Sequence, residues 1–532
     1  MKTRRCSCII TEFLGRQTKE NAVQKFLDKY SSLIIGKLSC FDRVVFKGYL
    51  PLGWPGAMKG LLYREGLLIK DFGAYVSRQS QRIRAAAEAF AKQQGRPCES
   101  FNGKDKDGEA RRIAQKDGIT EGLICVFRAQ ETCPSFKVAY GKDRPDLVNA
   151  RRRFLCLYFY FLDREFGLMH VRLQTWFPLT VQICVNGHSW LAHQLDKAKI
   201  GYRRIDNGFL QIDDCPRAQE LADRFIRKKW PRILEAFAKK VNPLLKDTLK
   251  GKKHYWVIDQ SEFATDIMFR DRNTLSPVFQ VLLRWAILCF SAKNIMAFLG
   301  RKLHGNFQGE VRTEYRDRWP GACIRHALNR NRIKMYDKFG CILRIETVIN
   351  NPREFRVRRQ GKCRGQLVMG WFPMAKGVQN MYRYAEVSLQ ANQNYLAALA
   401  EVDTSSLEAA AQMRRAAAPV RRRGRSYRGF NPASTTDERL FAAILRGEHA
   451  IHGLRNQDVR CALFGDAKRP KLRRRHAGRV TRLLKRLHAH GLIAKIPHSR
   501  RWRATAHGRA LMIASLKFHH HDFTELVNTQ SL

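Results

Sequence analysis

The chain has 532 residues, which is too long for a single hydrophobic core, so two to four domains are expected. Its 98 lysines and arginines against 47 aspartates and glutamates give a net charge of +51, which indicates a polyanionic partner. Nucleic acid is favoured as this partner over a membrane surface. The sequence has no C-x-x-C pair for a zinc ribbon and no apolar run of about eighteen residues for a membrane span, which makes both improbable.

Residues 1–150 are predicted to form an N-terminal α/β region. The run Asp42–Leu50 is typical of a strand and ends at Pro51. The segment that begins at Arg78, "RQSQRIRAAAEAFAKQQG", predicts a basic amphipathic helix that closes at its glycine. Neither pattern indicates a chemical function.

Residues 151–405 are predicted to form a central α+β domain. Aromatic and β-branched runs from Phe154, broken at "DREFG" and Pro178, predict an antiparallel meander of three strands. A helix follows Asn186 and covers the sheet. His188 and His193 lie five residues apart on this helix, which is wrong spacing for two ligands on one face, and we interpret them as ordinary polar or core residues.

An acidic, strand-like run follows a helical region over residues 218–249. The run "HYWVIDQSEFATDIMFRDR" carries the carboxylates Asp259, Glu262, Asp266 and Asp271. A further apolar helix over residues 275–299 separates it from the segment "NRIKMYDKFGCILRIETVINN". The acidic run and this later segment are therefore expected to be neighbours in one sheet.

The later segment predicts a β-hairpin with "DKFG" as its turn. Alternation places Tyr336 on the polar face, beside Lys334 and across the hairpin from Glu346. A tyrosine beside a carboxylate that holds Mg²⁺ or Mn²⁺ is what DNA nicking needs, because the metal polarises the scissile phosphate while the phenolate attacks. We therefore predict Tyr336 as nucleophile and Glu346, Asp266 and Asp259 as metal ligands, with Glu262 as a further catalytic carboxylate. The alternative is a polar strand face whose carboxylates pair with arginines.

The sequence Tyr-Asp-Lys followed by Arg-Ile-Glu resembles the core hairpin of replication initiators from rolling-circle plasmids and filamentous phages. The resemblance implies metal-dependent nicking. The chain has no His-hydrophobic-His ligand pair on a predicted strand, as many such enzymes do, so carboxylates would take the place of the histidines. The whole chain is also similar to large bacterial proteins associated with mobile elements.

Residues 406–434 are rich in alanine and arginine and poor in groups that could be buried. This composition predicts a basic flexible linker, disordered until it meets phosphates. A tether that only adds solubility is the alternative.

Residues 435–532 are predicted to contain three helices and two strands separated by "HSRR". In the third helix an apolar stripe would turn Arg479, Arg482 and Arg486 outward. The segment "RVTRLLKRLHAHGLIAKIPHSRRWRATAHGRAL" resembles the recognition helix and wing of winged-helix proteins, including MarR-type regulators. The resemblance implies that the helix reads DNA and that the wing touches phosphate or the minor groove. The predicted DNA-binding residues are Arg479, Arg482, Lys485, Arg486, Arg500, Arg501 and Arg503.

Three functions remain open at this point. A mobile-element or plasmid-type DNA-binding protein with metal-dependent nicking or strand transfer accounts for the charge, the third helix and the acidic residues together. A non-enzymatic winged-helix regulator and an RNA-binding component of a ribonucleoprotein are the alternatives, with DNA favoured over RNA. The sequence predicts no membrane partner and a cytoplasmic, nucleoid-associated protein.

Overall fold

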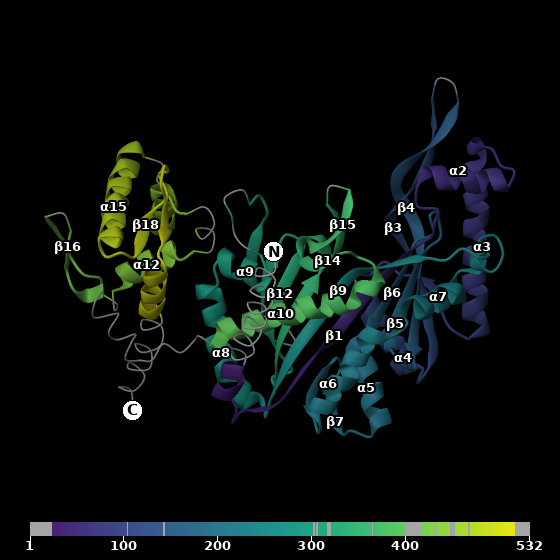
Figure 1. Ribbon diagram of the computed structural model, residues 1–532, viewed down its shortest axis with the longest axis horizontal. Helices are drawn as coiled ribbons and strands as arrows, with labels where there is room; N and C mark the ends of the chain where they lie inside the picture. The colour runs from purple at the N-terminus through teal and green to yellow at the C-terminus, as the bar shows by residue number, and fades with distance from the viewer. Residues whose placement is uncertain are drawn as a thin grey trace.

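The computed structural model describes residues 24–103, 105–141, 144–301, 304, 307–316, 321–363, 365–400, 416–422, 424–431, 434–446, 449, 453–466 and 469–516. The architecture is α+β, as the sequence predicts: one large sheet is covered by helices, and a smaller helical unit lies at the C-terminal end (Figure 1). We call residues 24–400 the body and residues 416–516 the C-terminal unit.

The body is built on an eleven-stranded sheet with the order β10-β11-β12-β13-β9-β1-β6-β5-β4-β3-β2. Neighbouring strands pair antiparallel, except for the short β2, which pairs parallel with β3. The strands are β1 Ile34–Tyr49, β2 Cys98–Ser100, β3 Gly122–Tyr140, β4 Pro145–Asp163, β5 Gly167–Gln174, β6 Val181–Asn186, β9 Tyr255–Phe269, β10 Val311–Arg316, β11 Cys323–Leu328, β12 Asn331–Lys338 and β13 Ile342–Ile349.

Helices cover this sheet. Helices α3 and α4 pack against β3, α5 and α6 against β1, and α10 against β9 and β13. Two small hairpins, β7 Tyr202–Ile205 with β8 Gly208–Ile212 and β14 Arg356–Cys363 with β15 Gln366–Pro373, complete the body. The helices are α2 Pro55–Arg64, α3 Phe72–Gln93, α4 Lys106–Lys116, α5 Gly187–Ala198, α6 Cys215–Asp223, α7 Trp230–Val241, α8 Arg272–Cys289, α9 Ala292–Phe298 and α10 Met381–Ala400.

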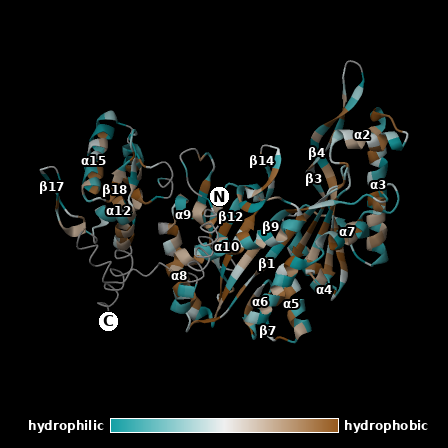
Figure 2. Ribbon diagram, viewed as in Figure 1, coloured by the Kyte–Doolittle hydropathy of each residue, from teal (hydrophilic) through white to brown (hydrophobic). Residues whose placement is uncertain are grey.

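The middle of the sheet is buried on both faces. Apolar residues run along the central strands (Figure 2), and one hydrophobic cluster extends from Phe26 to Leu399. Every residue of β13 is buried, including Arg344, Glu346 and Thr347. Polar side chains at such positions need partners inside the protein, because leaving them unpaired would cost free energy.

Several predicted elements are confirmed. The meander is β4, β5 and β6, and α5 begins after Asn186, whose side chain accepts a hydrogen bond from the Ser189 backbone. The acidic strand β9 pairs with β13, and the predicted hairpin turns at Phe339 and Gly340, both with positive φ. The boundary predicted near residue 150, however, falls inside β4, and strands from both sides of it share the sheet.

The C-terminal unit has its own hydrophobic cluster, which includes Phe430, Leu440, Val480 and Leu487. Among the described residues, the hairpin of β18 Ile493–Lys495 and β19 Trp502–Ala504 is preceded by helices α12 Thr435–Ile444, α14 Asn456–Phe464 and α15 Pro470–Ala489. Residues 506–516 are again helical. This succession of elements follows the sequence-based expectation.

The basic segment 406–434 needs a correction. Residues 406–415, 423, 432 and 433 lie outside the described residues, but the segment contains a hairpin of β16 Val420–Arg422 and β17 Arg425–Tyr427. Phe430 is buried against Phe441, and the carbonyls of Arg428 and Gly429 accept hydrogen bonds from Arg486. These residues are therefore packed against helices α12 and α15, because one aromatic ring and two backbone carbonyls make contacts that the amino-acid composition does not predict.

Among the described residues, no single helix has the length and apolar character to cross a membrane. The bent pair Arg272–Ile287 and Ala292–Phe298 would meet that test only when the two helices are counted together.

Candidate active site

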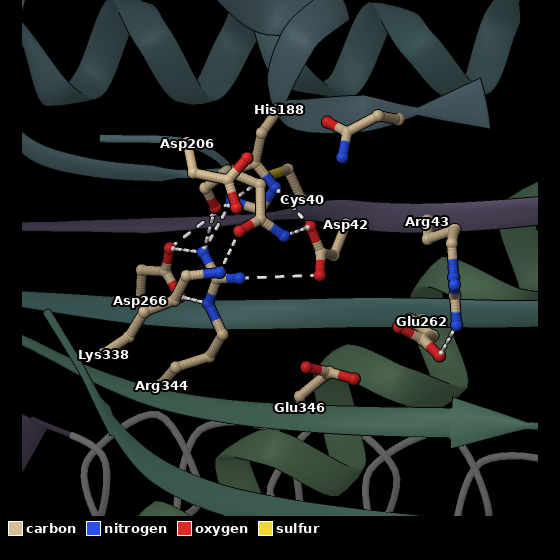
Figure 3. Close-up of polar contacts among 12 residues, drawn as sticks. Cys40, Asp42, Arg43, His188, Asp206, Glu262, Asp266, Lys338, Arg344 and Glu346 are labelled. Atoms are coloured by element: carbon tan, nitrogen blue, oxygen red, sulfur yellow. Dashed lines mark hydrogen bonds and ion pairs between the residues drawn. The ribbon is translucent and has the colours of Figure 1, made fainter. Parts of the chain in front are cut away.

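The neighbouring strands β13, β9 and β1 present buried polar side chains near the middle of the sheet (Figure 3). The register places Arg344 opposite Asp266 and Arg43 opposite Glu262. A β-bulge between Phe41 and Arg43 leaves Asp42 outside the regular pairing. Bulges redirect side chains and are frequent beside active sites.

Three carboxylates meet here, and we call Asp42, Glu262 and Glu346 the three-carboxylate group. Each offers an oxygen, and these oxygens all lie within 4.8 Å of one another. The residues are only 4%, 8% and 1% exposed. Oxygen ligands at about 2.0–2.6 Å from one ion span such distances, so the group fits a hard divalent cation such as Mg²⁺ or Mn²⁺.

Basic and hydroxyl groups surround two of these carboxylates. Arg43 Nη2 donates to Glu262 Oε1 at 2.9 Å, and Lys334 Nζ donates to Glu346 Oε1 at 2.6 Å. The Tyr336 hydroxyl donates to Glu346 Oε2 at 2.5 Å. Burial, followed by the charge of Glu346, raises the pKa of Glu262. The charges of Lys334 and Arg43 lower the pKa of Glu262 but do not outweigh this rise. The site around Glu262 therefore favours a bound proton or an additional cation.

A second network lies next to this group and is centred on Arg344. Its guanidinium donates two hydrogen bonds of 2.6 Å to the Asp266 carboxylate. His188 Nδ1 lies 3.0 Å from Asp42 Oδ1, and His188 Nε2 lies 3.1 Å from Arg344 Nη2. Asn207 donates to Asp42 Oδ1 at 2.8 Å. The ring of His188 and the amide of Asn207 thus fix the position of Asp42.

The pKa values in this network favour ionised aspartates. Burial alone would raise the pKa of Asp266, but Arg344 and His188 lower it to about 2. Burial is likewise outweighed at Asp42, where Arg344 and His188 hold the pKa well below its usual range. Because both oxygens of Asp266 accept hydrogen bonds from Arg344, through Nε and Nη2, and Asp266 lies outside the three-carboxylate group, we do not assign it as a metal ligand.

A cavity of about 240 Å³ reaches the three-carboxylate group from the side of α4, β5 and β6, and Asp42 and Glu262 belong to its wall. A wider hollow of about 680 Å³ shares Arg111, Asn186 and Asn207 with it. Arg164 and Arg204 line this outer hollow. Acidic residues also line these spaces, Asp107 in the cavity and Asp196 and Asp206 in the outer hollow, and Arg111 pairs with Asp206 at 2.6 Å.

The predicted site residues are placed as follows. Tyr336 and Glu346 are in contact across the hairpin, as alternation predicts, and Glu262 belongs to the same group. Asp266 pairs with Arg344 instead. Asp259 lies outside the three-carboxylate group and accepts a hydrogen bond of 3.3 Å from Gln182. The residues whose oxygens lie close enough to contact one ion are therefore Asp42, Glu262 and Glu346, and not the predicted set of Glu346, Asp266 and Asp259.

The predicted nucleophile has an unfavourable environment for ionisation. Burial and then the charge of Glu346 raise the pKa of Tyr336 well above its ordinary value. Lys334, predicted to lie beside Tyr336, pairs with Glu346 and not with the tyrosine hydroxyl. Tyr336 therefore holds its proton and orients Glu346 in this structure.

Sequence reasoning missed Asp42 and His188. The position of Asp42 in a strand-like run, between Phe41 and Arg43, could have marked it as a candidate site residue, since buried strands rarely hold unpaired carboxylates. His188 is fully buried and was interpreted as an ordinary residue. Its proximity to Asp42 depends on long-range packing of α5 against β1, which residue spacing does not show.

In the C-terminal unit, most of the predicted DNA-binding residues are at the surface. Arg501 is half-buried. The prediction that Arg486 contacts DNA is wrong for this structure, because Arg486 is only 7% exposed. Its guanidinium lies 3.2 Å from Asp437 and stacks 3.8 Å from the centre of the Phe430 ring. Asp437 is buried in the first turn of α12 and needs a cation. The exposed residues are Arg479, Arg482, Lys485, Arg500 and Arg503.

Comparisons of the chain with protein-family models, with curated proteins and with solved structures found no match.

Proposed function

We propose that this is a DNA-binding protein whose body cleaves DNA with a divalent metal ion, as a mobile-element or plasmid-type nicking or strand-transfer enzyme does. The observation that carries the proposal is the three-carboxylate group, which joins three neighbouring strands beside a cavity and an outer hollow whose wall includes Arg164 and Arg204. A net charge of +51 suits a nucleic-acid substrate.

Asp42, Glu262 and Glu346 would hold Mg²⁺ or Mn²⁺. Such an ion polarises a phosphate and lowers the pKa of a bound water. Arg344 and His188 keep Asp42 ionised and in place, and Tyr336 and Lys334 orient Glu346. Since Tyr336 holds its proton, we favour attack by water over attack by tyrosine.

The C-terminal unit supports a role in DNA binding. Three helices followed by a two-stranded hairpin are the arrangement of a winged helix, and α15 would be its recognition helix. Arg479, Arg482 and Lys485 are exposed on α15, and Arg500 and Arg503 are exposed on the hairpin. We propose that these five residues contact phosphates or base edges of duplex DNA.

A non-enzymatic DNA-binding protein is the second candidate, and one observation favours it. Glu262, Glu346 and Asp266 each have a basic partner, namely Arg43, Lys334 and Arg344. Such pairing would let the cluster act as a structural network without a metal.

The experiment that separates these candidates incubates the purified protein with supercoiled DNA and Mn²⁺ or Mg²⁺, with EDTA as the control. The proposal expects conversion to nicked or linear DNA that EDTA abolishes. Full binding of the plasmid without any strand break in either metal would favour the non-enzymatic candidate.

A further inference from the structure

A second site lies in the C-terminal unit, where the β16–β17 hairpin faces the last turns of α15 and strand β19. A pocket of about 510 Å³ lies between these elements, and we call it the basic pocket. Among the described residues, no aspartate or glutamate lines it. Its walls are Arg422, Arg425, Tyr427, Lys485, His488, Ala489 and Trp502.

The hairpin brings two like charges together. Arg422 and Arg425 are direct partners across the two strands, so their side chains share one face, which also carries Tyr427. Like charges at such positions destabilise a hairpin. Lys485 adds a third cation from α15, and all three side chains are exposed. This concentration of positive charge would be relieved by a bound anion.

The hairpin is nevertheless held in position. Arg422 Nη1 donates a hydrogen bond of 2.7 Å to the His488 carbonyl, which ties β16 to α15. His488 Nδ1 contacts the Ile493 carbonyl at 3.0 Å, and its ring lies 5.2 Å from the ring of Trp502. The pocket is therefore formed before any ligand binds.

The aromatic walls indicate what kind of anion fits. Tyr427 and Trp502 are partly buried and both line the basic pocket. Aromatic rings beside basic side chains are the usual platform for an unpaired base with its phosphates. The volume is that of a small-molecule site, and a paired, stacked base of a duplex has no free face to present to it.

We propose that the basic pocket binds an unpaired nucleotide of a DNA strand, with its phosphates at Arg422, Arg425 and Lys485 and its base against Trp502 or Tyr427. The inference rests on the proposed DNA binding. It adds a preference for unpaired nucleotides, which a duplex-binding helix does not supply. It would direct the protein to DNA ends with overhangs, gaps or opened duplex.

The test measures equilibrium binding of the full-length protein to a blunt duplex and to the same duplex with a three-nucleotide overhang. We expect the overhang to increase the affinity about tenfold. The double variant Arg422→Ala, Arg425→Ala should lose this increase and keep its affinity for the blunt duplex. Arg421→Ala is the matched control, because Arg421 pairs with Ser426 on the opposite face of the hairpin and should keep the increase.

Each contrary result has a distinct meaning. Equal affinity of the wild-type protein for both duplexes overturns this inference alone, whereas failure to bind either duplex contradicts the proposed function as well. Equal loss of the preference in the Arg421→Ala control would show that general charge, and not the pocket, produces it. Binding of free dAMP without any preference for the overhang would assign the pocket to a free nucleotide and overturn the proposal.

Discussion

Glu346 receives hydrogen bonds from both Lys334 and Tyr336, so it links the predicted nucleophile to the three-carboxylate group. Glu346→Gln keeps the shape of the side chain and removes its charge. We expect at least a hundredfold loss of metal-dependent nicking, with DNA binding retained. Nicking rates and filter binding on the same preparation check this. Unchanged nicking by Glu346→Gln would remove this residue from the metal site.

Tyr336→Phe removes only the hydroxyl that donates to Glu346. Because the pKa of Tyr336 is raised by burial and by Glu346, we expect this variant to cleave within about tenfold of wild type, and neither protein to form a covalent adduct with DNA. Denaturing electrophoresis of labelled DNA detects such an adduct. A wild-type protein-DNA adduct that disappears in Tyr336→Phe would restore tyrosine as the nucleophile.

At the scale of elements, Arg486 joins α15 to α12 and to the segment before it. Arg486→Ala leaves Asp437 buried without its cation, so we expect the free energy of unfolding of the C-terminal unit to fall by about 3 kcal/mol. Arg482→Ala, at an exposed position of the same helix, should change it by less than about 0.5 kcal/mol and weaken DNA binding instead. Chemical denaturation and DNA titration distinguish the two. Equal stability of both variants would contradict the buried role of Arg486.

His326 joins β11 to α10, since its Nε2 lies 3.0 Å from the Tyr395 hydroxyl. Burial lowers the pKa of His326 to about 3, whereas the unfolded chain has the ordinary value of about 6.5. The unfolded state therefore binds the proton first, and stability is lost as pH falls from about 6.5 toward about 3.

Between pH 7 and pH 4.5 we expect wild type to lose about 2.5 kcal/mol more than His326→Gln, because the variant has no such proton to bind. Urea denaturation at the two pH values measures this difference. An identical pH dependence in both proteins would show that His326 is not held neutral by burial.

Strands and helices with strong local patterns were predictable, and the positions that depend on distant packing were not. The hairpin that joins Tyr336 to Glu346 follows from alternation and a glycine turn. Asp42 enters the site through a bulge in β1, and local alternation cannot locate a bulge. Arg486 lies on a helix whose arginines look equivalent in sequence, and only the buried Asp437 on another helix separates it from Arg482.

At the scale of the whole molecule, the net charge of +51 predicts that DNA binding weakens as the salt concentration rises. The logarithm of affinity should fall linearly with the logarithm of salt concentration, with a slope of about −0.9 for each phosphate contacted. Removing Arg479, Arg482 and Lys485 together should make the slope less steep by about 2 to 3. Titrations between low and moderate salt measure this. An unchanged slope would place the DNA interface elsewhere.

The measurement that tests the central claim most directly compares Glu262→Gln with Asp259→Asn in the nicking of supercoiled DNA with Mn²⁺. Both residues lie on β9, but only Glu262 belongs to the three-carboxylate group. The account predicts that Glu262→Gln loses metal-dependent nicking while Asp259→Asn stays near the wild-type rate, with both variants folded by circular dichroism. Nicking that survives in Glu262→Gln and disappears in Asp259→Asn would contradict the account.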